Sequence, residues 1–479
     1  MTKINLKKLT IKDAHNAMVK GDFTAQELAQ AYLDNINPEL NAFIVVFDDV
    51  LEQAKKADGR FADGTAELMT GIPMAIKNNI LIKGKRTTAG SKILENYKAS
   101  YDATVIQKLK KAGAIFMGGT NLDEFAHGSS TENSAFGVTK NAFDSERVAG
   151  GSSGGSAVVV ASEMALVALG SDTGGSIRQP ASFNGVLGLK TTYGRVSRNG
   201  AVAMGSSFDQ IGPFAKNIED IKIVFDCIKG EDKMDSTTLK DEEVEKVNQK
   251  IDLAKKMTIG IPRHFLQEGI DADVMEKFEE SIEKFKKEGY EIKEIELPNI
   301  QYSLAVYYVL VPAEISANLA RFDGVRFGFK KEGENLLEDY MKTKGEGFGK
   351  ETRRRIMLGT YILSAGYKDA YYNKAQAVRK IIREDFKKAF SEVDVILTPT
   401  TPTPAFKIGS KGSDPIQMYL EDIFTVSSNV VGNPAISVPM GFVKRGEKEL
   451  PVGLQILAPH MHEEVLFKVS FDFLGGPTS

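Results

Sequence analysis

The sequence contains little cysteine and no long apolar run. Cys227 is the only cysteine among 479 residues, so no internal disulfide can form, and its apolar neighbours predict a buried thiol. No stretch approaches the ~18 uninterrupted apolar residues that a membrane-spanning helix needs, and residues 1–22 contain no apolar leader. We therefore expect a cytoplasmic protein without a membrane partner.

A surplus of charge of one sign is also lacking. The 61 lysines and arginines are offset by 64 aspartates and glutamates, which gives a formal net charge of −3. This balance gives no general reason for the chain to bind nucleic acid. With 42% apolar and 26% charged residues, the composition is that of a globular protein with a sizeable core.

Helix-like and strand-like segments alternate along much of the chain, which predicts an α/β fold with several parallel strands. Helices are predicted at 104–112, 157–163, 272–289 and 353–386, and strands at 114–117, 166–169, 258–261, 291–297, 393–397, 435–438 and 452–457. Thr10 and Thr24 are the expected N-caps of two opening helices. We predict a single domain over 1–479, with a helical N-terminal segment at about 1–62 and a helical insertion at about 301–390.

Two loops rich in glycine and serine, at 150–156 and 170–176, are the most informative part of the sequence. Such composition also occurs in flexible linkers, but here each loop leads directly into an apolar, helix-like segment. Glycines allow the backbone to approach a ligand closely, and a helix N-terminus offers unpaired N–H groups to a developing oxyanion. The loop that ends at Ser176 therefore supplies both a hydroxyl and possible donors.

A serine hydroxyl needs a base to become a nucleophile. None of the five histidines can be matched to a carboxylate from the sequence, so a Ser-His-Asp triad is an open alternative without a signal of its own. Lys77 is flanked by apolar residues at 71–80, although most lysines are solvated. Burial would disfavour its ammonium form and lower its pKa from about 10.4, which would allow it to act as a general base.

Three separated segments resemble the amidase signature family: 71–79 around Lys77, 150–157, and 170–180. The resemblance implies a large mixed central sheet covered by helices on both faces. It also implies a triad in which Ser176 is the nucleophile, Ser152 the bridging serine on a cis peptide, and Lys77 the base, with Ser153 as the alternative to Ser152. No metal is implied.

The same resemblance suggests how the nucleophile loop works. Backbone N–H groups would form the oxyanion hole, and they are those of Thr173, Gly174, Gly175 and Ser176. Asp172 and Arg178 flank the loop and could brace it by an ion pair, or could form a plain surface pair.

Segments 119–137, 321–326, 354–360 and 432–439 extend the resemblance to the A-type subunits of glutamyl-tRNA(Gln)/aspartyl-tRNA(Asn) amidotransferases. This branch of the family implies hydrolysis of glutamine to glutamate and ammonia, which passes to a partner for amidation of Glu-tRNA(Gln) or Asp-tRNA(Asn). Two partner subunits, of B and C type, would complete a heterotrimer. ATP and magnesium are expected in the partner, with no cofactor in this chain.

Glutamine is a zwitterion, so a selective site needs a cation for its carboxylate and an anion for its ammonium group. Arg355 and Asp422 are the predicted pair, because a guanidinium offers a planar fork to a carboxylate. Arg354 and Glu421 are close competitors. Tyr307 and Gln210 are weaker candidates for the pocket lining.

Other interpretations stay open at this point. A stand-alone amidase would share the triad, and an α/β-hydrolase would use 150–154 as a nucleophile elbow, although 141–148 does not resemble the strand it requires. A noncatalytic phosphate-binding module would use the glycine-rich loops differently. The chain after Phe467 also lacks the final helix that is usual in the family.

Overall fold

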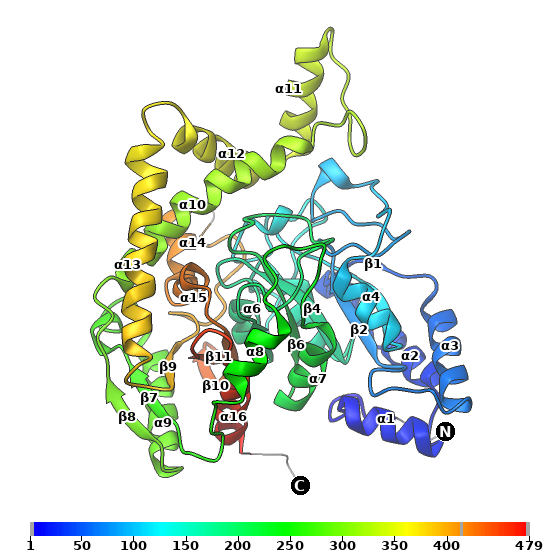
Figure 1. Cartoon of the computed structure of the whole chain (residues 1–479). Helices are drawn as coiled ribbons and strands as arrows, with labels where there is room; N and C mark the ends of the chain where they lie inside the picture. Colours follow the sequence, from blue (N-terminus) through cyan, green and yellow to red (C-terminus); the bar gives the residue numbers. More distant parts are fainter. Residues whose placement is uncertain (1–3, 412–414, 476–479) are drawn as a thin grey trace.

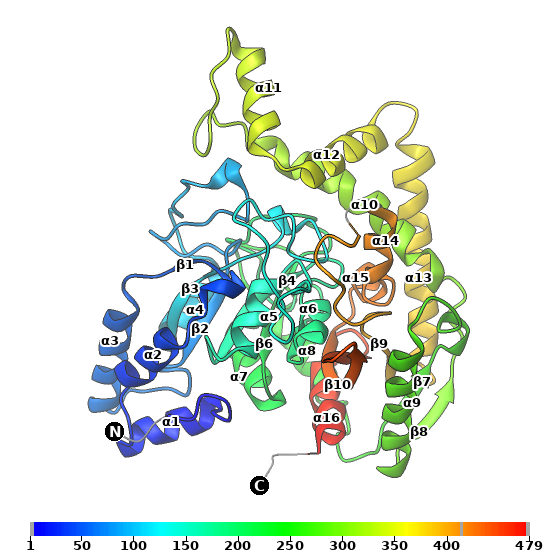
Figure 2. The same ribbon diagram turned by 180° about the vertical axis from the view of Figure 1, so that it is seen from behind.

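The computed structural model, which describes residues 4–411 and 415–475, is built on one eleven-stranded sheet (Figure 1 and Figure 2). The strand order is β1-β3-β2-β4-β6-β5-β10-β11-β9-β7-β8. The strands are β1 Phe43–Val46, β2 Pro73–Lys77, β3 Ile115–Thr120, β4 Val167–Asp172, β5 Leu187–Lys190, β6 Gln210–Ala215, β7 Thr258–Ile261, β8 Glu291–Glu294, β9 Val395–Pro399, β10 Ala435–Arg445 and β11 Lys448–Leu457.

The sheet is mixed. Strand β2 pairs in parallel with β3 and β4, and β7 pairs in parallel with β8 and β9, whereas the other pairings are antiparallel. Helices flank the sheet, with α5 packed on β2 and β4 and α9 packed on β9 and β10. The predicted class, α/β with a large mixed central sheet, is confirmed.

Sixteen α-helices accompany the sheet in the described residues. The first eight are α1 Ile11–Lys20, α2 Ala25–Asp34, α3 Val50–Ala62, α4 Thr104–Lys111, α5 Gly154–Ala161, α6 Arg178–Phe183, α7 Ile218–Ile228 and α8 Asp241–Asn248. The others are α9 Ala272–Lys287, α10 Ser303–Asn318, α11 Leu336–Gly347, α12 Lys350–Leu363, α13 Lys374–Ala389, α14 Pro415–Tyr419, α15 Val426–Val431 and α16 Glu463–Leu474.

Several local predictions are confirmed. Thr10 caps α1, and Thr24 caps α2 through a capping box with Glu27. The predicted helix-to-strand successions appear as α4 followed by β3 and as α5 followed by β4. Within the first 62 residues, however, the chain also contributes the edge strand β1.

Three predictions of element boundaries are wrong. The single helix expected over 353–386 is two helices, because the chain turns between α12 and α13 at Gly366, whose φ of +85° is left-handed. Strands β10 and β11 extend beyond the predicted 435–438 and 452–457 because they pair with each other as a long antiparallel hairpin. The final helix thought to be missing exists as α16, whereas residues 476–479 lie outside the described residues.

Helix α10 lies at the centre of a hydrophobic cluster of its own, separate from the main core of the sheet. With its flanking turns it spans Ile300–Arg321, and by length and composition alone this segment could cross a membrane. It instead packs against α12, α13 and α15, and half of its most apolar 18-residue stretch is buried inside the protein. We therefore interpret α10 as a core helix that supports α12.

The contact between α10 and α12 depends on Gly359. A Cβ atom at Gly359 would lie 1.8 Å from the carbonyl oxygen of Pro312, so Gly359→Ala must separate the helices. We expect a loss of about 3 kcal/mol in unfolding free energy, seen as a lower apparent melting temperature. Gly345→Ala on α11 is the matched control, because nothing lies within 4 Å of its added Cβ. Equal melting temperatures for the two variants would refute this account of the packing.

Candidate active site

Lys77 is the last residue of β2, and its side chain is completely buried. Its Nζ lies 2.8 Å from Ser152 Oγ, 2.7 Å from Ser153 Oγ and 2.9 Å from Ser171 Oγ. Burial lowers the pKa of Lys77 to about 7, although Asp123, Asp172 and Asp209 raise it in part. Near neutral pH the amine is therefore often uncharged and able to accept a proton.

The loop that carries Ser152 is held against Lys77 by Asp123. The peptide bond between Gly151 and Ser152 is cis, and the Ser152 carbonyl accepts a hydrogen bond from the Asp123 N–H. The Asp123 carboxylate accepts from the backbone N–H groups of Ser130, Thr131 and Asn133. A Cβ at Gly151 would lie 2.1 Å from Asp123 Oδ2, so only glycine allows this close approach.

Ser176 follows β4 in the second glycine-rich loop and is 8% exposed. The two loops are joined directly, because the Ser153 N–H donates to the Ser176 carbonyl at 3.1 Å. The Ser153 hydroxyl also donates to the Ser171 carbonyl, whereas the only hydrogen bond of the Ser152 hydroxyl among the described residues is the one from Lys77. Ser152 is thus free to bridge toward Ser176, although no direct hydrogen bond joins the two hydroxyls in the described chain.

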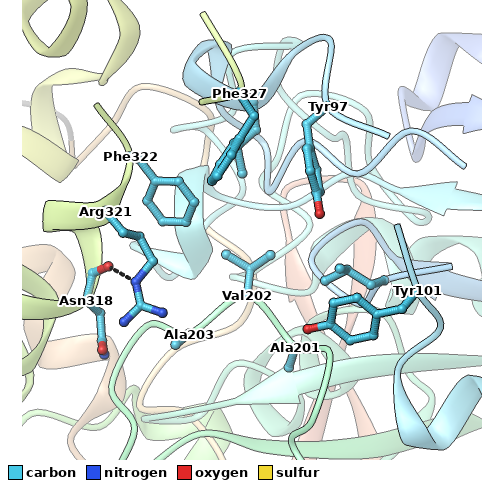
Figure 3. A pocket seen from close by; sticks show the side chains of 11 residues that line it. Tyr97, Tyr101, Ala201, Val202, Ala203, Asn318, Arg321, Phe322 and Phe327 are labelled. Carbon is cyan, nitrogen blue, oxygen red and sulfur yellow. Dashed lines mark hydrogen bonds between the residues drawn. The ribbon is translucent and has the colours of Figure 1, made fainter. Parts of the chain in front are cut away.

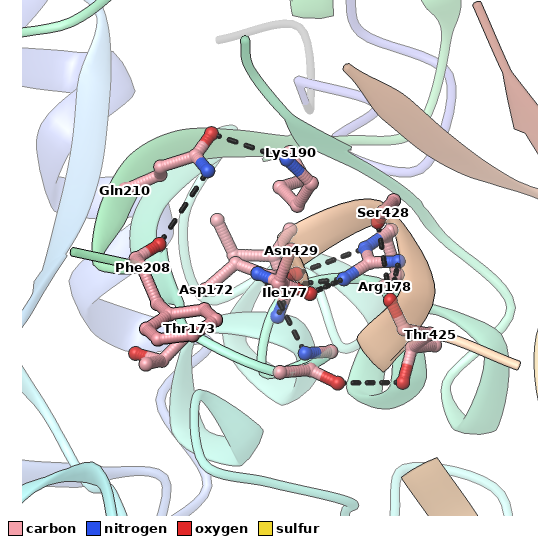
Figure 4. Close-up of polar contacts among 12 residues, drawn as sticks. Asp172, Thr173, Ile177, Arg178, Lys190, Phe208, Gln210, Thr425, Ser428 and Asn429 are labelled. Atoms are coloured by element: carbon pink, nitrogen blue, oxygen red, sulfur yellow. Dashed lines mark hydrogen bonds and ion pairs between the residues drawn. The ribbon is translucent and has the colours of Figure 1, made fainter. Parts of the chain in front are cut away.

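Asp172 and Arg178 form a fully buried ion pair behind this loop (Figure 4). Arg178 Nε and Nη2 lie 3.0 and 2.9 Å from the two carboxylate oxygens. Burial alone would raise the pKa of Asp172, but Arg178 outweighs it and the pKa falls to about 2. The carboxylate also accepts the N–H groups of Gly175 and Ile177. The surface-pair alternative is therefore wrong, and the ion pair fixes the backbone around Ser176.

The predicted oxyanion hole needs one correction. The Gly175 N–H donates to Asp172 Oδ1 at 2.9 Å, so it is not free to bind a substrate oxygen. The backbone N–H groups of Thr173, Gly174 and Ser176 donate to no other described residue. These three N–H groups are the available donors beside the Ser176 hydroxyl.

The two predicted substrate-binding charges meet at Tyr308, on α10. Arg355, on α12, is buried, and its guanidinium lies 5.5 Å from the Tyr308 ring centroid and 5.6 Å from that of Tyr419. Asp422 accepts hydrogen bonds from the Tyr308 hydroxyl at 3.0 Å and from the Ser129 hydroxyl at 2.9 Å. Arg355, which can bind a negative group, and Asp422, which can bind a positive group, thus contact the same tyrosine.

The competing charges are placed differently. Both arginines pair with Glu351, Arg355 through its Nε at 2.8 Å, but the Arg354 side chain is 39% exposed and that of Arg355 only 4%. Glu421 is buried in an ion pair with Lys411. Neither competitor contacts Tyr308 among the described residues.

Tyr307 and Gln210 have unequal positions. The Tyr307 ring lies directly on the nucleophile loop, since a Cβ at Gly174 would be 2.7 Å from the tyrosine oxygen. The Gln210 amide instead accepts from Lys190 at 3.3 Å and donates to the Phe208 carbonyl (Figure 4). Gln210 therefore supports the sheet behind Asp172, with which it pairs across β4 and β6.

Sequence reasoning missed three groups at the site. Ser171 contacts the Lys77 amine, and Ser129 and Tyr308 hold the Asp422 carboxylate. The only signals for Ser129 and Tyr308 were the family-like segment 119–137 and the neighbouring Tyr307. No motif marked Ser171, whose contact depends on the pairing of β2 with β4.

The histidine nearest to the glycine-rich loops in sequence, His127, contacts another part of the chain. His127 is buried beside Thr352, with its Nδ1 3.1 Å from the threonine hydroxyl, and burial lowers its pKa well below the usual value. No histidine hydrogen-bonds Ser152 or Ser176 among the described residues. Within residues 4–411 and 415–475, no group of three or more His, Cys, Asp or Glu side chains is placed to hold a metal ion.

A surface pocket of about 200 Å³ lies apart from these groups (Figure 3). Aromatic side chains form much of its wall, and Arg321 enters from the end of α10 with its Nε bonded to the Asn318 carbonyl. Neither Lys77 nor the serines of the two loops line it. This pocket is therefore separate from the candidate catalytic groups.

Known proteins resemble this chain over nearly its whole length. The family model described as Amidase matches residues 27–467. A relative from Caldanaerobacter subterraneus subsp. tengcongensis, named as the A-type subunit of glutamyl-tRNA(Gln) amidotransferase, is 49% identical over 475 residues, covering 98% of this chain and 96% of its own.

Solved structures give the same picture. A crystal structure of the A-type glutamyl-tRNA(Gln) amidotransferase subunit from Thermotoga maritima aligns with a TM-score of 0.80 and 41% identity, covering 100% of this chain and 97% of that one. The peptide amidase from Stenotrophomonas maltophilia aligns with the same TM-score but 27% identity, covering 98% and 97%. The fold is thus shared more widely than the sequence.

Proposed function

The chain belongs to the amidase family, and from that premise we propose that it hydrolyses glutamine as the A-type subunit of a tRNA-dependent amidotransferase. The observation that carries the proposal is the buried Lys77 amine, which lies 2.8 Å from Ser152 Oγ. The residue after Ser152 is joined to the Ser176 loop, because the Ser153 N–H donates to the Ser176 carbonyl. Identity of 49% to the Caldanaerobacter relative over nearly the whole chain supports this choice of substrate.

The proposed reaction begins with a proton relay. Neutral Lys77 accepts a proton from Ser152, which accepts one from Ser176 as the Ser176 oxygen attacks the side-chain amide carbon. The free N–H groups of the loop stabilise the oxyanion of the tetrahedral intermediate. The relay then runs in reverse and protonates the departing nitrogen, so that ammonia leaves and Ser176 carries the acyl group. Water attacks this ester by the same relay and releases glutamate.

Substrate recognition follows from the charges at Tyr308. Arg355 would bind the α-carboxylate of glutamine, and Asp422 would bind its α-ammonium group. Tyr307 would close the pocket over the nucleophile loop.

Both charges are buried, and each is held in place by a protein partner. Glu351 accepts from Arg355 Nε at 2.8 Å. Ser129 and Tyr308 donate to Asp422. A ligand that carries both a carboxylate and an ammonium group would add a charge-assisted bond to each, whereas an amide without them would gain neither.

The proposed partners follow from the relatives, whose name describes them as one subunit of a larger enzyme. We propose B-type and C-type partner subunits that receive the ammonia and amidate Glu-tRNA(Gln) or Asp-tRNA(Asn). ATP and magnesium would act in the partner, and this chain would need no cofactor. Misacylated tRNA would meet this chain only through the complex.

A stand-alone amidase is the main alternative, because the peptide amidase from Stenotrophomonas maltophilia shares the fold. The two functions differ in what the paired charges bind. A free amino acid carries both a carboxylate and an ammonium group at one carbon, which suits the convergence of Arg355 and Asp422. A phosphate-binding module has less support, because the loop already directs two N–H groups to Asp172.

The first prediction about the reaction concerns the nucleophile. Ser176→Ala should abolish release of glutamate and ammonia from glutamine, and Lys77→Ala should nearly do so, because each removes a necessary part of the relay. Mass spectrometry after trapping with an amide-derived electrophile should place the adduct on Ser176. Ser410→Ala, an exposed serine distant in sequence, is the control. An adduct on another residue, or glutaminase activity retained by Ser176→Ala, would overturn the assignment.

The second prediction is the pH dependence. Lys77 must be neutral to accept a proton, so kcat should fall about tenfold per pH unit below pH 7 and level off above pH 8. Burial raises the pKa of Asp422 to about 7, and its carboxylate must be ionised to bind the ammonium group. The ratio kcat/KM should therefore fall more steeply than kcat. A kcat that stays constant down to pH 5 would exclude Lys77 as the base.

The third prediction separates two neighbouring arginines. Arg355→Ala should raise the KM for glutamine by at least about tenfold, because a buried charge-assisted bond to the carboxylate is lost. Arg354→Ala, one residue earlier and 39% exposed, should change KM by less than about twofold, because Glu351 keeps Arg355 as its second partner. Equal effects of the two substitutions would remove Arg355 from the pocket.

A further inference from the structure

Helix α12 has two faces with different surroundings. Its inner face carries Thr352, Arg355 and Gly359, all of them buried against the rest of the protein. Its outer face exposes Met357 at 72% and Tyr361 at 47%. A single rigid element therefore connects the proposed carboxylate-binding arginine to solvent-facing apolar side chains.

Tyrosines following α12 extend this exposed face. The rings of Tyr361, Tyr367 and Tyr371 form a triangle, with centroids 4.5 Å apart for the first pair and 6.1 Å for the other two. All three rings are more than 40% exposed. We call Met357, Leu358, Tyr361, Tyr367 and Tyr371 the α12 patch.

The patch lies at the outer edge of the molecule. Helices α11 and α12 form the top of the structure in both views, away from the N-terminal helices and β1 (Figure 1 and Figure 2). Contiguous exposed apolar side chains cost free energy in water, and they mark interaction sites when they are large. Methionine and tyrosine are enriched at protein–protein interfaces, and tyrosine is a frequent binding hot spot.

The charges around the patch indicate the partner's chemistry. Residues 350–374, which comprise α12, the turn that follows it and the first residue of α13, contain six lysines and arginines against two aspartates and glutamates, although the whole chain has a formal net charge of −3. A partner that complements this segment would border its apolar contact surface with carboxylates.

We propose that the α12 patch is the docking surface for a folded partner protein of the complex, which presents an apolar surface rimmed by acidic side chains. This inference rests on the proposed function, which requires such a partner. It adds the surface that the partner covers and the link from that surface to the glutamine site.

Helix α12 itself connects the patch to the proposed glutamine site. Gly359 packs so closely on Pro312 of α10 that α12 has little freedom to move inward, and α10 carries Tyr307 and Tyr308. A partner that covers the outer face of α12 clamps the helix from the other side. Docking therefore holds Arg355 against Tyr308 and lowers the KM for glutamine, while leaving the Lys77 relay and kcat unchanged.

Nucleic acid is a different occupant that a basic segment could attract. Part of the positive charge here is unavailable to phosphates, since Arg355 is buried and both Arg354 and Arg355 pair with Glu351. The most exposed side chains of the patch are apolar. These features favour a protein surface over a tRNA backbone.

The experiment uses the full chain, purified alone, and the B-type and C-type partner subunits, co-expressed with each other. The two preparations are then mixed. Met357→Glu and Tyr361→Glu place a charge in the patch facing an acidic rim, so the dissociation constant should rise at least about tenfold. Met234→Glu is the matched control, because Met234 is 74% exposed in another part of the chain. Its affinity should equal that of the wild type. All three variants should keep the basal glutaminase activity and melting temperature of the isolated chain.

Two further readouts decide between the possibilities. Adding partner should lower the KM for glutamine of the wild type and of Met234→Glu, but not of the two patch variants at the same concentration. Wild-type affinity in both patch variants would overturn the proposal, and so would intact assembly combined with weaker tRNA binding. Assembly is measured without glutamine, so failure of the glutaminase proposal would show separately, as a wild-type complex that does not hydrolyse it.

Discussion

The structure depends on keeping the Lys77 amine out of water. A lysine at the end of a central strand, with no exposed surface, is stable only where oxygen atoms surround it, and three serine hydroxyls do so here. Two of these hydroxyls come from a loop that closes on Asp123, where Gly151 alone permits the approach. The requirement to solvate one buried amine therefore also brings the proposed nucleophile loop and its neighbour together.

The buried ion pair of Asp172 and Arg178 offsets one electrostatic consequence of burying Lys77. Three carboxylates near Lys77 would favour its charged form, and Asp172 is one of them. Arg178 balances that charge, while the Asp172 oxygens hold the N–H groups of Gly175 and Ile177. The same carboxylate thus shapes the loop and leaves Lys77 able to lose its proton near neutrality. A buried pair contributes little net stability, so geometry is its clearer role.

Prediction from the sequence succeeded where chemistry is local. The apolar neighbours of Lys77 indicated burial, and the capping residues Thr10 and Thr24 marked the helix starts. It failed where distant segments decide the outcome. That the Gly175 N–H binds Asp172, or that Gln210 faces Lys190, depends on loop closure and strand pairing that no motif encodes. A single helix was expected over 353–386 because the periodic pattern continues through Gly366, but the chain turns there and forms two helices.

Helix α12 gives a physical reason for control of glutamine hydrolysis by a partner. Ammonia made without an acceptor would be wasted, so an amidotransferase gains from binding glutamine well only when its partner is present. A coupling of about 1–3 kcal/mol, typical of such control, changes affinity about 5- to 150-fold. The guanidinium of Arg355, the proposed carboxylate-binding group, lies over the rings of Tyr308 and Tyr419, so a small shift of α12 would change its orientation. A ligand on the outer face can therefore tune substrate binding without touching the Lys77 relay.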